Sequence, residues 1–428
     1  MSRPLRLGIA GLGTVGAGVV RIVQRHAALL SARIGREVTI RAVSARSQDK
    51  DRGLRIGDYD WVEDPVALAI RDDIDVFVEL IGGAEGVARA AVEAAIRAGK
   101  DVVTANKALL ATHGQALAEA AEAEGVCLRF EAAVAGGIPV IKVLTEGLAG
   151  NEINRVMGVM NGTCNFILTR MQDAGLDYRT VFAEAEALGF LEADPTLDVG
   201  GIDAGHKLAI LAAIAFGTRV DFGAMEIEGI ERITIEDIQQ AADMGYRIKL
   251  LGVAQKTGRG LETRTSPCLV PMDSALGQLE NATNMVVLEG DAVGQIALRG
   301  AGAGEGPTAS AVMSDIVDIG RGIRVPTFGK PAVELTHARA ANASSPASYY
   351  LRMALEDRPG ALAKIAAVLG DSGISIDRMR QYGHTDPTAP VLIVTHKATK
   401  TALDQAIAAM ASTGVLASEP VAIRIEET

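Results

Sequence analysis

The 428-residue chain has few cysteines, few aromatic residues and no long uninterrupted hydrophobic run. Its three cysteines, Cys127, Cys164 and Cys268, are far apart and odd in number, so their spacing indicates neither a disulfide framework nor a zinc site. We therefore expect a reducing, cytoplasmic location. No apolar stretch reaches the length of a membrane span, and the start, MSRPLRLGIAGLG, lacks the apolar core of a signal peptide. We expect no membrane partner.

Positive charge is also scarce. The chain has 42 Lys and Arg against 53 Asp and Glu, which gives a formal net charge of -11. This balance argues against a general nucleic-acid binder. A composition that is 48% hydrophobic and 22% charged is typical of a globular protein, and the length predicts two or three domains.

Glycine is abundant near the N-terminus. The stretch LRLGIAGLGTVGAGVVRIVQRH has the pattern of a short buried strand, a glycine turn and a helix. Gly11 permits the tight turn, Gly13 lets the backbone approach a pyrophosphate, and Gly16 lets the helix pack on the strand. The pattern predicts a dinucleotide site, and the alternative is a glycine-rich turn in another α/β protein.

Strand and helix patterns then alternate to about residue 135, which predicts an α/β Rossmann fold with a doubly wound parallel sheet. Ligands of such sheets bind at the carboxyl ends of the strands. This places Gly82 and Gly83, and then Thr104, Asn106 and Lys107, at the mouth of the site. Lys107 could act on a proton there, or it could be only a solvated strand end.

The end of the second strand bears on the choice of cofactor. It reads VSARSQDK, with Arg46 and no immediate carboxylate to hold the ribose hydroxyls of NAD. An arginine at this place suits a 2′-phosphate, so the sequence favours NADP over NAD. The alternative is that Arg46 is a solvated loop residue.

From about residue 138 the pattern changes to that of an α+β unit. GIPVIKVLTEGLAG, FILTRMQDAG and TVFAEAEALG have helical patterns, and the segments from IKLLGVAQKTG to MVVLEGDAVGQIALRG have those of antiparallel strands. An open sheet of this kind could pair with a copy of itself, so we expect a homodimer or a larger homo-oligomer.

The densest charge lies in EADPTLDVGGIDAGHKLAI, directly before an almost wholly apolar helix. Asp203 and Lys207 have the i, i+4 spacing of a helical ion pair, and Lys207 falls on the apolar stripe of that helix. An unpaired lysine is rare in such a place. We therefore expect Asp203 to orient a functional Lys207, with Glu192 and Asp198 available to hold a small cationic or hydroxylated substrate. The alternative is an exposed surface pair.

The remaining sequence completes the predicted division of the chain. GAGAGEGPTASAVMSDIVDIG is a glycine turn that opens a helix, with Pro307 near its start, and this helix could return the chain to the first domain. The end of the chain has the βαββαβ order of a ferredoxin-like domain. The division is 1–135 (dinucleotide domain), 136–305 (substrate and dimerisation domain), 306–322 (returning helix), 323–348 (linker) and 349–428 (regulatory domain).

Taken together, these motifs resemble homoserine dehydrogenase, in its single-function form with a C-terminal ACT domain. The resemblance rests on GLGTVGAG, VVTANKALLA, EAAVAGGIP, MNGTCNFILT, EADPTLDVGGIDAGHKLAILA and GAGAGEGPTASAV, and for the ACT domain on DRPGALAKIAAVL. It implies reversible reduction of L-aspartate 4-semialdehyde to L-homoserine with NAD(P), in the biosynthesis of threonine, methionine and isoleucine. It also implies feedback by an amino-acid effector, most plausibly threonine.

The resemblance also implies roles for individual residues. Lys207 is the proton donor and acceptor, Asp203 orients it, and Lys107 is a second lysine near both cofactor and substrate. The implied substrate-binding residues are Glu192, Asp198, Gly162 and Thr163. The cofactor-binding residues are Gly11, Gly13, Thr14, Val15, Gly16, Arg46, Thr104, Lys107 and Gly304. A sodium ion is implied at Glu131, Val134, Gly136 and Ile138, and the regulatory residues are Asp357, Pro359, Gly360 and Ala361. Glu305 stands where many members have a third glycine.

Two other functions fit parts of the chain. Another ACT-tailed NAD(P) dehydrogenase would act on a hydroxy acid or prephenate and would lean on a catalytic histidine, and only His206 lies in a charged cluster. A nucleotide or amino-acid sensor would not need Asp203 and Lys207 in a buried helix.

Overall fold

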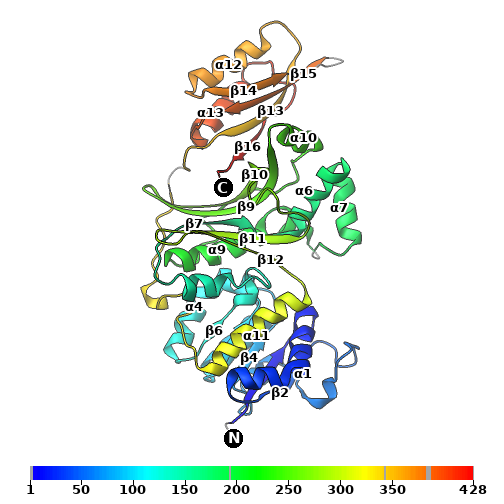
Figure 1. The fold of residues 1–428 in the computed structure, drawn as a ribbon, viewed down its shortest axis with the longest axis vertical. Helices are drawn as coiled ribbons and strands as arrows, with labels where there is room; N and C mark the ends of the chain where they lie inside the picture. The colour runs from blue at the N-terminus through cyan, green and yellow to red at the C-terminus, as the bar shows by residue number, and fades with distance from the viewer. Residues whose placement is uncertain (1–2, 192–193, 342–343, 382–386, 428) are drawn as a thin grey trace.

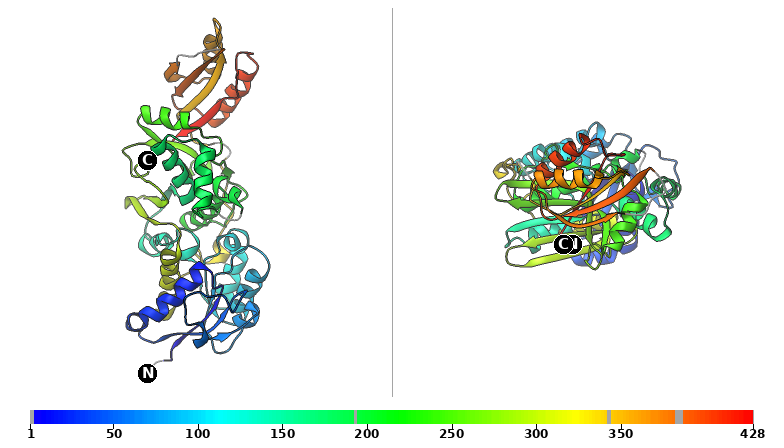
Figure 2. Two further views of the ribbon diagram at one scale, coloured as in Figure 1. Left: turned by 90° about the vertical axis from the view of Figure 1, so that its right-hand side faces the viewer. Right: turned by 90° about the horizontal axis from the view of Figure 1, so that it is seen from above.

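The computed structural model describes residues 3–191, 194–341, 344–381 and 387–427. The molecule is elongated, with a parallel sheet at the N-terminal end, a mixed sheet in the middle and a small α/β unit at the far end (Figure 1, Figure 2). The chain does not finish at the far end. Its last strand returns to the middle of the molecule, beside the central sheet (Figure 1).

The N-terminal sheet is entirely parallel and has the order β3-β2-β1-β4-β5-β6. Its strands are β1 (Leu5–Ala10), β2 (Val38–Ser44), β3 (Asp60–Trp61), β4 (Val76–Glu79), β5 (Asp101–Thr104) and β6 (Leu128–Arg129). Apart from the short edge strand β3, the strands are largely buried and apolar because helices cover both faces. The predicted doubly wound sheet is confirmed. The strand order reverses between β1 and β4, and ligands of such sheets bind at that point.

Helices of two origins cover this sheet. The local helices are α1 (Thr14–Ile34), α2 (Pro65–Ala69), α3 (Val87–Arg97) and α4 (Lys107–Ala123). A fifth, α11 (Glu305–Arg321), arrives from much later in the chain and packs against α1, with Ala309 and Val312 in the same core as Val19 and Val20. The helix expected after the second glycine turn therefore returns to the first unit, and Pro307 lies in its first turn.

The central unit contains the predicted antiparallel strands with helices on them. The strands are β7 (Ile153–Val159), β8 (Glu226–Ile227), β9 (Tyr246–Thr257), β10 (Gly260–Pro271), β11 (Thr283–Gly290) and β12 (Gly294–Ala301). The helices are α5 (Val140–Lys142), η3 (Val143–Gly147), α6 (Gly162–Ala174), α7 (Tyr178–Ala187), α8 (Pro195–Val199), α9 (Ile202–Phe216) and α10 (Ile235–Asp243). The helix expected at GIPVIKVLTEGLAG is α5 running into η3, which is a π-helical turn.

The C-terminal unit has the predicted ferredoxin-like order. Its elements are β13 (Tyr349–Glu356), α12 (Ala361–Asp371), β14 (Ile376–Gln381), β15 (Thr388–Thr395), α13 (Lys400–Ala411) and β16 (Val421–Ile425). Nothing in the sequence indicated how this unit is attached. Strand β16 pairs with β13 on one side and with β10 on the other, so the two sheets form one continuous sheet that ends at β12 and at β14.

The segment between α11 and β13 packs along the body of the molecule. Phe328 and Leu335 are buried in the main core, and Thr336 and Ala340 form isolated bridges with Thr218 and Leu261. Cys127, Cys164 and Cys268 are buried and unpaired in disulfides. Among the described residues, no helix has both the length and the apolar character that a membrane crossing requires.

Candidate active site

Lys207 lies at the centre of a buried polar cluster on α9. The helix is apolar on nearly every side, and its side chains from Leu208 to Ala213 are buried in the core. The side chain of Lys207 is only 11% exposed. Its Nζ donates hydrogen bonds to Asp203 Oδ2 at 2.7 Å and to the carbonyl of Met160 at 2.8 Å. The i, i+4 pair therefore faces the protein interior, as the apolar stripe predicted, and is not a surface pair.

A second lysine joins the cluster from the N-terminal unit. Lys107 is the first residue of α4, directly after β5, and its Nζ lies 3.1 Å from Asp203 Oδ1. Asp203 thus stands between two ammonium groups that come from different units. Burial opposes ionisation of Asp203, but the charges of Lys207 and Lys107 outweigh it and hold its pKa well below the usual range. Lys107 is not merely a solvated strand end.

Asn161 is a central residue of this cluster that the sequence reasoning missed. Its Nδ2 donates to Asp198 Oδ1 and to Asp203 Oδ2, both at 2.9 Å, and the residue is 3% exposed. Its Oδ1 accepts from the backbone N–H of Cys164 and so caps α6. One amide therefore holds two carboxylates side by side. The available signal was an N-cap residue directly after a buried strand, which alone predicts only a helix start.

The first residues of α6 lie beside this amide. Gly162 and Thr163 open the helix, whose first N–H groups have no partner within the helix. A side chain at Gly162 would collide with the carbonyl of Ala282. The hydroxyl of Thr163 donates to the carbonyl of Phe190 at 2.9 Å. Glu192, the remaining predicted substrate residue, lies outside the described residues.

Two other polar residues of this region have structural roles. Asp194 caps α8 by accepting from the N–H of Thr196. The ring of His206 packs on Phe222 with a centroid distance of 4.3 Å. Burial, together with the charge of Lys107, lowers the pKa of His206. His206 is therefore a packed helix residue, and it offers no support for a histidine-based dehydrogenase.

The glycine turn after β1 has the geometry that a dinucleotide requires. Gly11 has φ +100°, and a side chain there would collide with the backbone of Leu80. A Cβ on Gly16 would collide with the carbonyl of Gly11. A Cβ on Gly13 would meet nothing within 4 Å, because the space beside the start of α1 is open. Thr14 and Val15 form the first turn of that helix, and their N–H groups are available to an anion.

A buried acid next to this turn was also missed. Glu79 ends β4 and is fully buried, yet its carboxylate accepts from the N–H groups of Ile81 and Gly82 and from Thr104 Oγ1 at 2.5 Å. Asn106 then donates to the carbonyl of Gly83. Thr104 thus shapes the loop at the mouth of the sheet, and these contacts connect the nucleotide turn to Lys107.

The loop after β2 carries Arg46, which is exposed. Arg52 folds this loop onto the glycine turn, because its guanidinium donates to the carbonyls of Leu12 and Ser47 at 3.0 and 2.7 Å. Arg46 therefore lies near the turn without any carboxylate at the end of β2. Nothing in the sequence singles out Arg52, since its partners are backbone carbonyls and that of Leu12 is distant in the chain.

The turn predicted to hold sodium packs against the turn before α11. Glu131, Val134, Gly136 and Ile138 are all buried. The Glu131 carboxylate accepts from the N–H groups of Ile141 and Lys142 at 2.9 Å. Gly136 has φ +56°, and a side chain there would collide with Gly302, two residues before Gly304. Glu305 forms an ion pair with Arg21 of α1 and so fastens α11 to the nucleotide-binding helix.

The predicted regulatory residues are not part of this cluster. Asp357, Pro359, Gly360 and Ala361 form the turn from β13 into α12, at the far end of the molecule (Figure 1). Gly360 has φ +87°, and Ala361 is buried in the core of the C-terminal unit. Any influence of this turn on Lys207 must therefore act over a distance and not by direct contact.

Comparison with known proteins identifies families that match each part of the chain. The family model of homoserine dehydrogenase matches residues 139–317, that of the homoserine dehydrogenase NAD-binding domain matches 11–131, and that of the ACT domain matches 349–414. The chain is 44% identical to the homoserine dehydrogenase of Neisseria gonorrhoeae over 432 residues, covering 99% of both chains.

Solved structures agree. A crystal structure of a homoserine dehydrogenase from Thiobacillus denitrificans has a TM-score of 0.94 and 42% identity, with 99% of both chains covered. A hyperthermophilic archaeal homoserine dehydrogenase in complex with NADPH has a TM-score of 0.63 and 28% identity, with 74% of this chain and 97% of that chain covered.

Proposed function

The chain belongs to the homoserine dehydrogenase family of NAD(P)-dependent oxidoreductases, and from this premise we propose how its residues carry out the reaction. Lys207 is the proton donor when L-aspartate 4-semialdehyde is reduced to L-homoserine, and the proton acceptor in reverse. The observation that carries this proposal is the buried Lys207–Asp203–Lys107 cluster, with distances of 2.7 and 3.1 Å, at the junction of the two units.

The open space at Gly13 and the free N-terminus of α1 fit a dinucleotide. When bound, the reduced nicotinamide supplies a hydride to the aldehyde carbon. The aldehyde oxygen then gains negative charge, which the ammonium of Lys207 stabilises and neutralises by giving up a proton. Asp203 orients the Lys207 ammonium through their hydrogen bond before transfer, and Lys107 adds positive charge on the cofactor side. The product is the alcohol.

The substrate is an amino acid, so its ammonium and carboxylate must both be held. Asp198 is 4% exposed and oriented by Asn161, which makes it suitable for the ammonium. The N–H groups of Gly162 and Thr163 at the start of α6 suit the carboxylate. Glu192 is proposed as a further partner of the ammonium.

We propose NADP as the preferred cofactor. Support comes from exposed Arg46 beside the nucleotide turn, from the lack of a carboxylate at the end of β2, and from the NADPH complex of the archaeal relative. Arg46→Ala should raise the KM for NADPH about tenfold and leave that for NADH unchanged, because only NADPH carries the 2′-phosphate. Initial rates with both cofactors measure this. Equal effects on both would contradict the role.

A sodium ion is proposed at the turn of Glu131, Val134, Gly136 and Ile138. The residues fit a hard cation held mainly by oxygen, because they form one buried turn beside a carboxylate. Among the described residues there is no group of three or more His, Cys, Asp or Glu that could hold a metal ion, so backbone carbonyls would have to supply most of the ligands. The ion would fix the turn that packs on Gly302 and so the position of Gly304 near the cofactor.

The remaining proposals concern regulation and assembly. We propose that the ACT domain at 349–428 binds an amino acid, threonine, through the turn of Asp357, Pro359, Gly360 and Ala361. We also propose a cytoplasmic homodimer or homotetramer serving threonine, methionine and isoleucine biosynthesis. The division of the chain into 1–135 with 306–322, 136–305, 323–348 and 349–428 is likewise proposed.

One assay tests the activity. Purified protein is incubated with L-homoserine and NADP or NAD, with and without L-threonine, and nicotinamide absorbance is followed. We expect turnover that favours NADP and that threonine suppresses. Absence of turnover from folded protein with either cofactor would contradict the assignment of the active site.

A further inference from the structure

The C-terminal strand joins the ACT domain to the catalytic unit. Strand β16 is an edge of the ferredoxin-like sheet, where its Ile423 faces Tyr350 of β13. It is also the neighbour of β10, where Cys268 faces Arg424 and Leu269 faces Ile425. The hydrogen bond from the N–H of Glu426 to the carbonyl of Leu269 extends this pairing by one residue. Residues at the very end of the chain therefore belong to both units.

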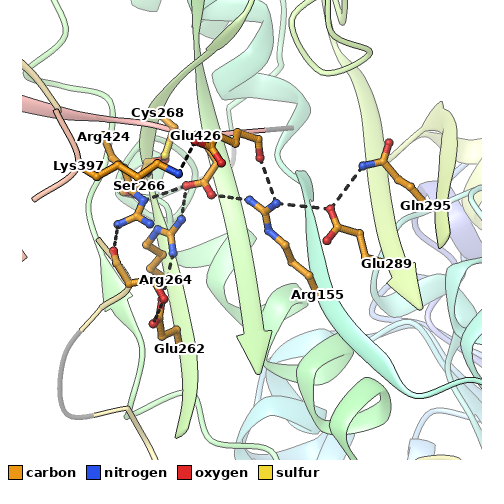
Figure 3. A network of polar contacts seen from close by, with 12 residues as sticks. Arg155, Glu262, Arg264, Ser266, Cys268, Glu289, Gln295, Lys397, Arg424 and Glu426 are labelled. Atoms are coloured by element: carbon orange, nitrogen blue, oxygen red, sulfur yellow. Dashed lines mark hydrogen bonds and ion pairs between the residues drawn. The ribbon is translucent and has the colours of Figure 1, made fainter. Parts of the chain in front are cut away.

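Glu426 is the hub of a buried ion cluster at this seam (Figure 3). Its carboxylate binds Arg155 through Oε1 and Arg264 through Oε2, and Arg424 Nε donates to Oε2 at 3.0 Å. The Glu426 side chain is 6% exposed and that of Arg264 is 8% exposed. Burial opposes ionisation, but the three guanidinium groups keep the pKa of Glu426 below its usual range.

The three arginines come from three different strands. Arg155 lies on β7, Arg264 on β10 and Arg424 on β16. Glu289 of β11 lies 3.4 Å from Arg155, and Glu262 lies 4.0 Å from Arg264. Three arginines and three glutamates thus balance in charge. The carboxylate of Glu426, directly after β16, therefore binds side chains from two strands of the catalytic unit, β7 and β10.

Strand β7 leads from this cluster to the catalytic lysine. Five residues after Arg155, the carbonyl of Met160 accepts from Lys207. The next residue, Asn161, holds the carboxylates of Asp198 and Asp203. A strand is stiff over this distance, about 16 Å, so a shift of its seam end moves Met160 and Asn161.

Strand β10 gives a second connection. The residue after Arg264 is Thr265, whose carbonyl accepts from the N–H of Glu228. Thr265 and Glu228 also lie against Gly201, the N-cap residue of α9. Asp203 follows two residues later. Strand β7 therefore ends beside the catalytic cluster, and β10 passes the start of α9 at Thr265.

We propose that Glu426 is the positioning residue through which the ACT domain acts on the active site. Effector binding changes the placement of β16, Glu426 transmits this change to Arg155 and Arg264, and β7 and β10 carry it to Asn161 and Asp203. This inference rests on the proposed function, because it deepens the regulation assigned there to the ACT domain.

The test compares two adjacent glutamates in the full-length enzyme. Glu426→Gln removes the hub charge, whereas Glu427→Gln removes the same charge from a side chain that is 78% exposed and pairs only with Lys397 among the ion pairs described. Threonine affinity is measured by calorimetry with and without the dead-end complex of NADPH and L-homoserine. Binding linkage requires that an effector which weakens substrate binding is itself weakened by substrate, to the same extent.

In the parent enzyme and in Glu427→Gln, we expect the dead-end complex to weaken threonine binding by about tenfold, within the usual range of allosteric coupling. In Glu426→Gln this factor should fall to about one, with the affinity of threonine alone changed less than about threefold. Asp237→Asn is a control for destabilisation, because it breaks another buried seam ion pair, with Arg352 at 2.6 Å, that does not involve β7 or β10. It should keep the coupling. A coupling factor in Glu426→Gln equal to that of the parent would overturn the proposal.

Hydrogen exchange tests the connection between Glu426 and the active site without an effector. Amides of residues 157–164 and 201–207 should exchange at least threefold faster in Glu426→Gln than in Glu427→Gln, with both variants folded by circular dichroism. If threonine does not affect the parent enzyme, the proposed effector is wrong. The hydrogen-exchange rates then test by themselves whether Glu426 is connected to the active site. Unchanged exchange in both segments would refute its connection to the active site, whatever the effector.

Discussion

Strand β7 carries a buried charged cluster at each end, and the two clusters differ in their cations. The catalytic cluster contains Lys207 and Lys107 around Asp203, while the seam cluster contains three arginines around Glu426. Lysine can lose its proton, whereas arginine keeps its charge under all conditions a protein meets. The difference agrees with the proposed roles, in which a proton moves at the catalytic cluster and charge stays fixed at the seam cluster.

The two clusters also differ in access. Lys107 is 28% exposed, so the catalytic cluster is partly open to solvent, whereas the side chains of Glu426 and Arg264 are 6% and 8% exposed. In both, a carboxylate stays ionised despite burial because several cations face it. The catalytic cluster is thus accessible through Lys107, and the closed cluster joins two units.

The largest effect is expected at Lys207, where two substitutions distinguish the role of its charge from the role of its proton. Lys207→Ala should lower kcat about 10³-fold, since positioned proton donors contribute 10²–10⁴-fold. Lys207→Arg keeps the charge but cannot give up its proton, so its kcat should fall by a similar factor. Steady-state rates measure this, with urea unfolding as the control for folding. A variant within tenfold of the parent would remove Lys207 from the mechanism.

The second prediction concerns Asn161. Asn161→Ser keeps a cap for α6 but loses the amide that bridges Asp198 and Asp203, so their repulsion should displace both. We expect kcat/KM to fall about 50-fold, because the displaced carboxylates no longer orient Lys207 and the substrate. The matched control is Asp177→Ser, which changes the cap of α7 and should leave activity unchanged. Equal kcat/KM values for the two variants would show that Asn161 acts only as a cap.

The third prediction concerns how the seam cluster around Glu426 stabilises the fold at different pH values. Glu426→Gln removes the carboxylate that the three guanidinium groups share, and only the more distant Glu289 and Glu262 remain beside them. It should lower the free energy of unfolding by about 3 kcal/mol at pH 7. The folded-state pKa of Glu426 is lowered, so its contribution is fully present above the unfolded pKa of about 4.3 and is lost as the pH falls below it. Urea unfolding of parent and variant from pH 3 to 7 should show a constant gap above about pH 5 that narrows in acid. A gap that does not depend on pH would mean that packing, not charge, stabilises the seam.

The smallest effect is expected from a lysine placed in the seam. Arg264→Lys keeps the charge but loses the guanidinium fork, so stability should fall by about 1 kcal/mol while kcat stays within twofold of the parent. Urea unfolding and steady-state rates on the same preparation measure both. A large loss of activity without loss of stability would break the distinction between the two clusters.

Much of the fold was predictable because local patterns carry it. The glycine turn at Gly11 to Gly16, the alternation of strands and helices, the return of α11 and the βαββαβ order all agree with the structure. Lys207 could be singled out because a lysine on an apolar helical stripe is costly without a partner. Asn161, Glu79 and Arg52 could not be, since each is defined by contacts with residues distant in the chain.

The sequence by itself determined the folding units, the nucleotide turn and the spacing that pairs Asp203 with Lys207, because periodicity and i, i+4 geometry are local properties. Tertiary structure alone decided that Lys107 reaches the same carboxylate and that one amide holds two acids. It also decided that β16 is shared between two sheets, with Glu426 among arginines from three strands. The physical reason is that these charges are paired only after the strands that carry them have packed, and no local pattern records which buried ion will meet which.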